Sequence, residues 1–338
     1  MKQSILFLTF AMALTGLGSC GKSQQQTNNE TTEERTQQTP CPSFEADSAF
    51  ADIRKQCDFG PRVPGTQAWR LCSEWIVNRF EQAGLDVEVQ STDVTVWNGT
   101  QVPCRNIIAH LNPQASDRIL LCAHWDSRPW ADNDPDSGNH HTPVPAANDG
   151  ASGVAVLLEL ARQMAGDSTM TTGIDFVCFD VEDYGIPDWA ESTGETSDTW
   201  CLGSRYWAHH AGRNGYHAQF GILLDMVGGR GATFLKELVS LSVAEPLVNL
   251  VWDTAEEIGY GDYFLKEKGG AITDDHVEVN RLTRIPCIDI IPYYKNGDCS
   301  FGPTWHTVND TPENIDPQVL KAVGQTVMQV IYNYNQRN

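Results

Sequence analysis

Acidic and histidine side chains lie in or after several apolar runs of this 338-residue chain, and these residue types can bind a metal ion. They are His124, Asp126, Asp149, Asp180, Glu182, Asp183, Asp225, Asp274, Asp275, His276, Asp289 and His306. Carboxylates gathered in one place repel one another unless a cation neutralises them, and mixed oxygen and nitrogen ligands suit Zn²⁺. A single Asp after a strand is more commonly a helix cap, and a single His a surface group. Several together predict a zinc site.

The elements that must position these side chains are apolar strands that alternate with helices. Apolar runs of strand length cover 107–111, 119–123, 174–179, 220–224 and 285–291. Alternation at 87–89 and 94–97, before Asn98-Gly99, predicts two more strands joined by short turns. Helical spacing covers 66–83, 151–164 and 316–334, with Asp316 as the N-cap of the last helix and Pro317 at its first position.

This alternation predicts an α/β fold, a three-layer sandwich with a mixed, mostly parallel central sheet. We find no internal repeat, and we expect residues 41–338 to form a single domain. In open α/β sheets, ligands bind at the carboxyl ends of the strands, which is where most of the candidate residues lie. The predicted zinc site therefore has a predicted place, at one edge of the sheet.

Taken in order, the motifs of the chain resemble those of the zinc-dependent exopeptidase superfamily. The matching motifs are His124-x-Asp126, Asn148-Asp149-Gly150-Ala151-Ser152-Gly153, Asp180-Val181-Glu182-Asp183, Leu224-Asp225-Met226, Asp275-His276 and His306-Thr307. The resemblance covers about residues 50–335, and Gly60-Pro61-Arg62-x-Pro64-Gly65 lies near its start. It implies that the domain is a zinc-dependent catalytic domain with the exopeptidase-like fold.

Two branches of this superfamily fit the motifs, and several details resemble the second. Aminopeptidases of the superfamily bind two zinc ions, whereas type II (animal-type) glutaminyl cyclases, found also in some bacteria, use one. Asp274 precedes Asp275-His276, where aminopeptidases commonly have Ser. Trp305 directly precedes His306 in the segment WHTVNDTPENID, which is close to the cyclase pattern, and Leu202-Gly203-Ser204-Arg205 matches as well.

The cyclase resemblance implies a role for each residue of the site. The implied roles are zinc binding for Asp149, Asp183 and His306, catalysis for Glu182, Asp225 and Asp274, and substrate binding for Trp189 and Trp305. Glu182 would be the general acid and base, with Asp225 and Asp274 as its hydrogen-bonding partners. One zinc ion per chain would be the cofactor.

The reaction implied by the resemblance converts an N-terminal Gln of a peptide or protein, and more slowly Glu, to pyroglutamate with release of ammonia. The γ-carbonyl oxygen of the Gln would bind to zinc, which stabilises the developing negative charge. Glu182 would take a proton from the α-amine and return it to the departing ammonia. N-terminal Gln peptides and proteins would be the substrates.

Two residues depart from the pattern of the family, and two others keep an alternative open. Asp183 stands where many members have Glu, and Asp289 replaces a histidine of the animal cyclases, which leaves the role of that position undecided. His124 and Asp225 are also what an aminopeptidase would use for a second zinc ion, so the alternative is a di-zinc aminopeptidase that hydrolyses N-terminal residues. A protein that keeps the fold only for binding is disfavoured, because the general base and every ligand are present.

The charge of the chain excludes one class of function. The chain has 44 acidic and 23 basic residues, so its formal net charge is −21. A nucleic-acid-binding protein needs a basic face to neutralise phosphates, and we therefore expect no nucleic-acid partner. With 41% hydrophobic residues, the chain can bury a large core.

The N-terminus is typical of an exported bacterial lipoprotein. Residues 1–20 resemble a lipoprotein signal peptide, because Lys2 precedes an apolar stretch too short to span a bilayer and Leu-Gly-Ser-Cys resembles a lipobox. Cys20 would be lipidated, and the polar residues 21–40 would form a flexible tether. We expect membrane attachment only through this lipid, and a protein that faces the periplasm. Ordinary secretion with cleavage nearby is the alternative.

Nine cysteines follow Cys20, an odd number that cannot all pair. Cys122 and Cys178 lie in apolar strand-like runs and are predicted to be free buried thiols. Export permits disulfides among the others, without indicating their connectivity.

Overall fold

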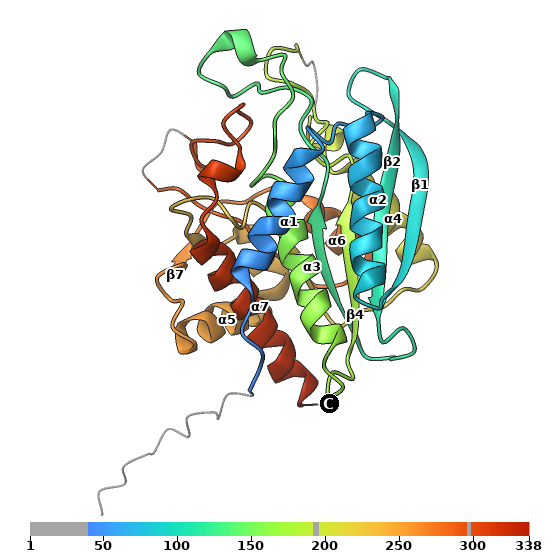
Figure 1. Cartoon of the computed structure of the whole chain (residues 1–338), viewed down its shortest axis with the longest axis vertical. Coiled ribbons are helices and arrows are strands. Elements are labelled where there is room, and N and C mark those ends of the chain that lie inside the picture. The colour runs from blue at the N-terminus through green and yellow to red at the C-terminus, as the bar shows by residue number, and fades with distance from the viewer. Residues whose placement is uncertain (1–39, 192–195, 296–298, 338) are drawn as a thin grey trace, which may run out of the picture. The chain divides into compact units, whose positions relative to one another are not determined.

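A six-stranded mixed sheet forms the centre of the computed structural model, which describes residues 40–191, 196–295 and 299–337 (Figure 1). The strands are β1 Asp86–Thr95, β2 Gln101–Leu111, β3 Arg118–His124, β4 Gly173–Phe179, β5 Gly221–Leu224 and β8 Cys287–Ile290, in the order β1-β2-β4-β3-β5-β8. Strands β4, β3, β5 and β8 are parallel, and β1 and β2 add an antiparallel edge. The predicted mixed α/β sheet is confirmed.

Helices account for most of the remaining regular structure among the described residues. The α-helices are α1 Ala46–Asp58, α2 Gln67–Gln82, α3 Ala151–Ala165, α4 Leu202–Arg213, α5 Leu238–Glu257, α6 Asp275–Thr283 and α7 Pro317–Asn335. Short 3-10 helices span Ser137–Asn139, Ser197–Thr199 and Pro312–Asn314. Strands β6 Phe234–Lys236 and β7 Phe264–Lys268 pair in a separate two-stranded sheet.

Both faces of the parallel strands are apolar, and helices cover both. Alternate residues of β3 belong to different cores: Ile119 and Leu121 to one cluster, Leu120 and Cys122 to another. Buried residues of α1, α2, α3, α5 and α7 complete the first cluster, and residues of α4 and α6 complete the second. In Figure 1, α1, α2, α3 and α7 lie in front of the sheet. Three layers follow because strands that are apolar on both faces need cover on both.

The predicted helix ends agree with the structure, whereas part of the strand prediction was wrong. The Asp316 side chain accepts from the backbone N–H of Gln318 at the start of α7, as predicted for its N-cap. The alternation at 87–97 forms one strand, β1, paired with β2 along its whole length, instead of two. The polar residues Gln90-Ser91-Thr92 interrupt the apolar alternation without ending the strand, because at an edge one side remains exposed to solvent.

Helices α1, α4, α5 and α6 were not predicted, although α1 buries Ala49, Ile53 and Gln56 along one face and is as amphipathic as α7. Pro246 lies inside α5, where Ala244 leaves helical geometry. Helices α4 and α6 begin directly after Cys201 and Asp274, in segments whose polar residues belong to the candidate site. Asp274 is the N-cap of α6 and accepts from the backbone N–H of Asp275, so this site residue is also the start signal of the helix.

The carboxyl ends of three adjacent parallel strands bring the candidate residues to one edge of the sheet. Strand β3 ends at His124, β4 is followed by Asp180 to Asp183, and β5 is followed by Asp225. His124 is paired with Phe179, the last residue of β4, so the two segments leave the sheet side by side. The predicted location at this edge is confirmed.

The predicted signal peptide, Cys20 and the tether up to residue 39 lie outside the described residues. Among the residues described, no helix is long and apolar enough to cross a membrane. All nine cysteines in the described ranges are free, and Cys122 and Cys178 are buried as predicted.

Candidate metal centre and active site

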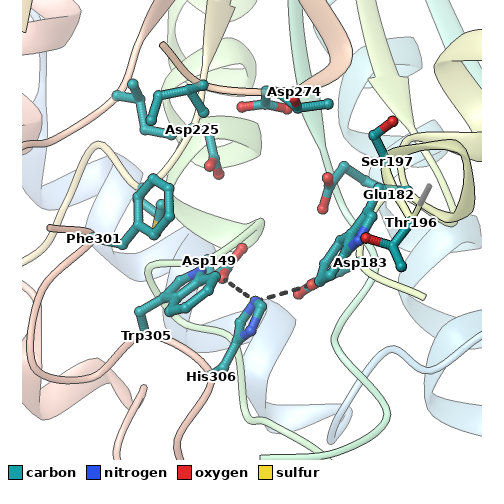
Figure 2. Close-up of a pocket in the computed structure, with 15 residues that line it drawn as sticks. Asp149, Glu182, Asp183, Thr196, Ser197, Asp225, Asp274, Phe301, Trp305 and His306 are labelled. Carbon is teal, nitrogen blue, oxygen red and sulfur yellow. Dashed lines mark ion pairs between the residues drawn. The ribbon is translucent and has the colours of Figure 1, made fainter. Parts of the chain in front are cut away.

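A cavity of about 250 Å³ opens at the carboxyl edge of the sheet (Figure 2). Its lining residues are Asp149, Glu182, Asp183, Thr196, Ser197, Trp200, Asp225, Met226, Ile272, Thr273, Asp274, Ile291, Phe301, Trp305 and His306. Five acids therefore share a small cavity with one histidine and three large aromatic side chains. The structure brings together all three predicted zinc ligands and all three predicted catalytic residues.

Asp149, Asp183 and His306 converge on one point of the cavity floor. The Nε2 atom of His306 lies 3.1 Å from Oδ1 of Asp183 and 3.5 Å from Oδ2 of Asp149. Dashed lines mark these two ion pairs in Figure 2. One potential ligand atom from each residue lies within 4.8 Å of the others, and all three side chains are buried.

The donor set of these three residues fits a divalent cation. Oδ2 of Asp149 and both carboxylate oxygens of Asp183 are buried without a hydrogen-bond partner. Burying carboxylates without partners is costly, and a cation at this point removes that cost. Burial and the nearby Arg128 guanidinium hold the pKa of His306 well below its usual value, so its imidazole is neutral, as a metal ligand must be. Two carboxylates and one imidazole are ligands that zinc accepts.

His124 and Asp225 form a second cluster that shares Asp149 with the first. Nε2 of His124 lies 2.9 Å from Oδ1 of Asp149 and 3.2 Å from Oδ1 of Asp225. Asp149 thus presents one oxygen to each cluster. Two clusters joined by one carboxylate are the arrangement that a second metal ion would need, and both contain the ligand types for it.

The turn after β4 is held in place by two buried acids, Asp126 and Asp180. Asp126 accepts from the backbone N–H groups of Glu182 and Asp183, at 3.1 and 3.2 Å. Val181 has a φ of 52°, a left-handed conformation that is strained for a β-branched residue. The Asp180 side chain accepts from the N–H of Val181 at 2.9 Å. These contacts offset the strain and direct Glu182 and Asp183 into the cavity.

Asp310 positions Asp149 from below in the same way. Its carboxylate accepts from the backbone N–H groups of Asn148 and Asp149, at 2.8 and 2.9 Å. The next residue, Gly150, has a φ of 97°, and a Cβ there would lie 2.8 Å from the carbonyl oxygen of Asp126. The turn that presents Asp149 therefore requires glycine for both conformation and space.

Arg128 is a buried cation behind the metal cluster. Its guanidinium donates to both carboxylate oxygens of Asp132 and, at 3.2 Å, to the backbone carbonyl of Asp183. It also lies over the ring of Trp200, 4.6 Å from the ring centroid. Trp200 in turn lies parallel to the His306 ring at 6.0 Å. One side chain therefore supports the Asp183 backbone and the aromatic wall of the cavity.

Glu182 has a different hydrogen-bond partner from those expected. Its Oε1 accepts from the thiol of Cys201 at 3.3 Å, while Asp274 lies in the same cluster of potential ligand atoms. Asp225 is hydrogen-bonded to His124 rather than to Glu182, which corrects the predicted partnership. Burial and then the Asp225 charge raise the pKa of Asp274 to about 7.

Asp289 is buried behind Asp274, in a cluster with His276. Both of its carboxylate oxygens lack hydrogen-bond partners, and its Oδ2 lies 3.8 Å from Nδ1 of His276. Burial and then the charge of Asp274 raise the pKa of Asp289 well above its usual value. A protonated Asp289 carries no charge, which limits repulsion in this wall of the site.

The two predicted pocket tryptophans have different positions in the structure. Trp305 lines the cavity and stacks on His306, with ring centroids 3.8 Å apart. Trp189 is 42% exposed, packs against His141 and Trp130, and is not among the cavity-lining residues. Trp200 takes the expected place in the wall. Its position in a polar stretch gave no periodic signal, although its proximity to Leu202-Gly203-Ser204-Arg205 could have indicated it.

A family model described as Peptidase family M28 matches residues 106–331 of the chain. This span contains every candidate residue from His124 to His306, and so both ligand clusters.

Two solved structures illustrate the similarity. Bacteroides thetaiotaomicron glutaminyl cyclase bound to N-acetylhistamine is 48% identical with a TM-score of 0.84, over 87% of this chain and 99% of that chain. Tannerella forsythia glutaminyl cyclase is 50% identical with a TM-score of 0.84, over 86% of this chain and 99% of that chain.

Curated relatives are more distant. Bos taurus glutaminyl-peptide cyclotransferase is 24% identical over 81% of this chain and 78% of its own length. The uncharacterized Escherichia coli protein YfbL is 36% identical over 33% of this chain, and Bacillus subtilis aminopeptidase YwaD 26% identical over 69%. The chain spans only 31% and 45% of the lengths of these last two proteins. With the family model matching most of its length, the chain belongs to peptidase family M28.

Proposed function

We propose that this protein is a zinc-dependent glutaminyl-peptide cyclotransferase, which converts N-terminal Gln, and more slowly Glu, to pyroglutamate. The observation that carries the proposal is the near full-length similarity to two bacterial glutaminyl cyclases, at 48% and 50% identity. The cavity supports it, because its metal-ligand cluster lies beside a carboxylate that can accept and donate a proton.

Asp149, Asp183 and His306 would hold one zinc ion per chain. When bound, zinc supplies a Lewis acid that stabilises negative charge on the γ-carbonyl oxygen of the substrate. Glu182 lines the same cavity and accepts the proton of the α-amine as this amine attacks the γ-carbon. Glu182 then returns the proton to the amide nitrogen, which leaves as ammonia. Asp274 lies near enough to Glu182 to receive a hydrogen bond from the substrate amine and orient it.

The aromatic walls of the cavity favour cyclisation over hydrolysis. Trp200, Trp305 and Phe301 line the cavity and leave little room for solvent beside a bound side chain. Water would compete with the α-amine for the same carbon, so its exclusion protects the intramolecular reaction. The small volume of the cavity also suits one Gln side chain better than a larger residue.

The proposal is tested by incubating the zinc-loaded protein with a Gln-initiated peptide and with leucine amide. We expect the peptide to lose the mass of ammonia without cleavage, and the same peptide with an acetylated N-terminus to remain unchanged. Glu182→Gln should abolish cyclisation and still bind zinc. His306→Ala should abolish cyclisation and also fail to bind zinc. Release of free leucine at a comparable rate would contradict the proposal.

A di-zinc aminopeptidase is the second candidate, favoured by one observation. His124 and Asp225 share Asp149 with the first cluster, so ligands for a second metal ion are present. The same Glu182 could then activate water. Metal analysis separates the candidates: about one zinc per chain supports the cyclase, and about two support the aminopeptidase.

We also propose that the protein is an exported lipoprotein that faces the periplasm, held to a membrane through Cys20. The Leu-Gly-Ser-Cys motif and the polar residues 21–40 support this. Labelling cells with a fatty acid should mark the wild-type protein and leave Cys20→Ser unlabelled. Equal labelling of both would contradict the anchor.

A further inference from the structure

Cys201 lies beside the proposed general base, Glu182, and takes no part in the proposed proton transfer. Its side chain is 2% exposed, and its sulfur lies 3.3 Å from Oε1 of Glu182. Oε1 has no other hydrogen-bond partner among the described residues. Glu182 also lines the cavity of the candidate site.

The backbone holds Cys201 and Glu182 together independently of the thiol. The N–H of Cys201 donates to the carbonyl of Glu182 at 3.0 Å, and the N–H of Leu202 donates to the carbonyl of Val181 at 3.1 Å. Cys201 has a φ of 55° and Val181 a φ of 52°, so both segments use left-handed residues at this contact. Left-handed conformations at both Val181 and Cys201, beside the two backbone hydrogen bonds, indicate that the surrounding structure holds these segments in contact.

We propose that Cys201 is a positioning residue for Glu182, whose thiol donates to Oε1 and so leaves the other carboxylate oxygen to exchange protons with the substrate. The proposal rests on the proposed acid and base role of Glu182. A glutamate side chain in a cavity has several rotamers, and a donor on one oxygen selects the rotamer that reaches the substrate.

The surroundings of Cys201 keep the sulfur protonated and therefore able to donate. Burial, followed by the negative charge of Glu182, raises the pKa of the thiol well above its usual value. A thiolate here would add another negative charge to a wall that already holds Glu182, Asp274 and Asp275. A protonated thiol is also a poor zinc ligand, which separates Cys201 from the metal cluster.

The experiment compares Cys201→Ala with Cys201→Ser, two side chains of similar size that differ in one hydroxyl donor. Kinetics are measured with whichever substrate the wild-type enzyme turns over, cyclised or hydrolysed, because Glu182 would serve in both reactions. We expect Cys201→Ala to lower kcat by about tenfold with little change in KM, and Cys201→Ser to recover most of the loss. Equal losses in both variants, or a loss confined to KM, would overturn the proposal.

Two further measurements do not depend on activity. The infrared S–H stretching band that disappears in Cys201→Ala should shift in Glu182→Ala, because its acceptor is then gone. An unchanged band would overturn the proposal even if the wild-type enzyme is inactive on every substrate tried. Zinc content should equal that of the wild type in both Cys201 variants, and loss of zinc would instead make Cys201 a ligand. Cys72→Ala, in the core of α2, controls for loss of a buried thiol elsewhere.

Discussion

Replacing Arg128 by Met should cost much more stability than replacing Arg70, although both arginines pair with an acid four residues away. Arg128 and Asp132 are almost completely buried, whereas Arg70 and Glu74 are about half exposed. Met keeps most of the volume of the arginine stem and removes only the guanidinium. The comparison therefore isolates the effect of burial on one kind of ion pair.

The expected magnitude follows from what Arg128 leaves behind. Its loss removes both hydrogen bonds to Asp132 and the one to the Asp183 carbonyl. Asp132 then keeps one donor, the backbone N–H of Asp188 at 3.1 Å. Removing one partner of a buried pair costs about 3–5 kcal/mol, because the other charge stays buried. For the exposed Arg70 pair, about 0.5 kcal/mol is expected.

The assay is urea unfolding of the metal-free proteins, which keeps zinc binding out of the comparison. A double variant sharpens it: adding Asp132→Leu to Arg128→Met removes the orphaned charge and should restore part of the lost stability. A cost below about 1 kcal/mol for Arg128→Met would refute the reasoning. The reasoning would also be refuted if the double variant lost as much stability as the two single variants together. That result would show that Arg128 and Asp132 are not energetically coupled.

Three further predictions concern the cavity wall, the buried Asp175 and a close contact at Gly203. Trp200→Ala should lower kcat/KM by about tenfold or more and Trp189→Ala by less than about threefold, since of these two tryptophans only Trp200 lines the cavity and stacks on His306. The reverse order would show that Trp189 faces the substrate. Burial alone would raise the pKa of Asp175, but hydrogen bonds from His110, Arg118 and Tyr216 outweigh it and lower this pKa from 3.8 to about 2. The ionised carboxylate therefore contributes about 2 kcal/mol to the free energy of unfolding at neutral pH. This contribution is lost as the pH falls from about 4 to about 2. The difference in unfolding free energy between wild type and Asp175→Asn should therefore shrink across that range, and a difference independent of pH would be inconsistent with this. Gly203→Ala should destabilise the fold by about 3 kcal/mol, because its Cβ would lie 1.9 Å from the carbonyl oxygen of Asp180. Gly166→Ala should be tolerated, because no atom lies closer than 3.5 Å to the added Cβ. Equal melting temperatures of the two variants would contradict this argument.

The sequence alone determined the α/β class, the edge of the sheet that holds the site, and the acids and the histidine that line the cavity. The reason is local: apolar runs define strands, and a parallel arrangement places the residues after them at one edge. Asp149, Glu182, Asp183 and Asp225 follow strands or precede helices, so their common location could be predicted. The motif resemblance then identified His306, which lies in a loop beyond the last strand.

Only the tertiary structure decided which side chains touch. Cys201 meets Glu182, Asp310 meets Asp149, and Arg128 reaches Asp183, over separations along the chain that no local pattern encodes. Trp200, rather than Trp189, lines the cavity because the positions of both depend on how the chain packs after Asp183, not on residue type. Hydrogen bonds and ring contacts form between residues that the folded backbone brings within a few ångströms, and the sequence states only which partners are available.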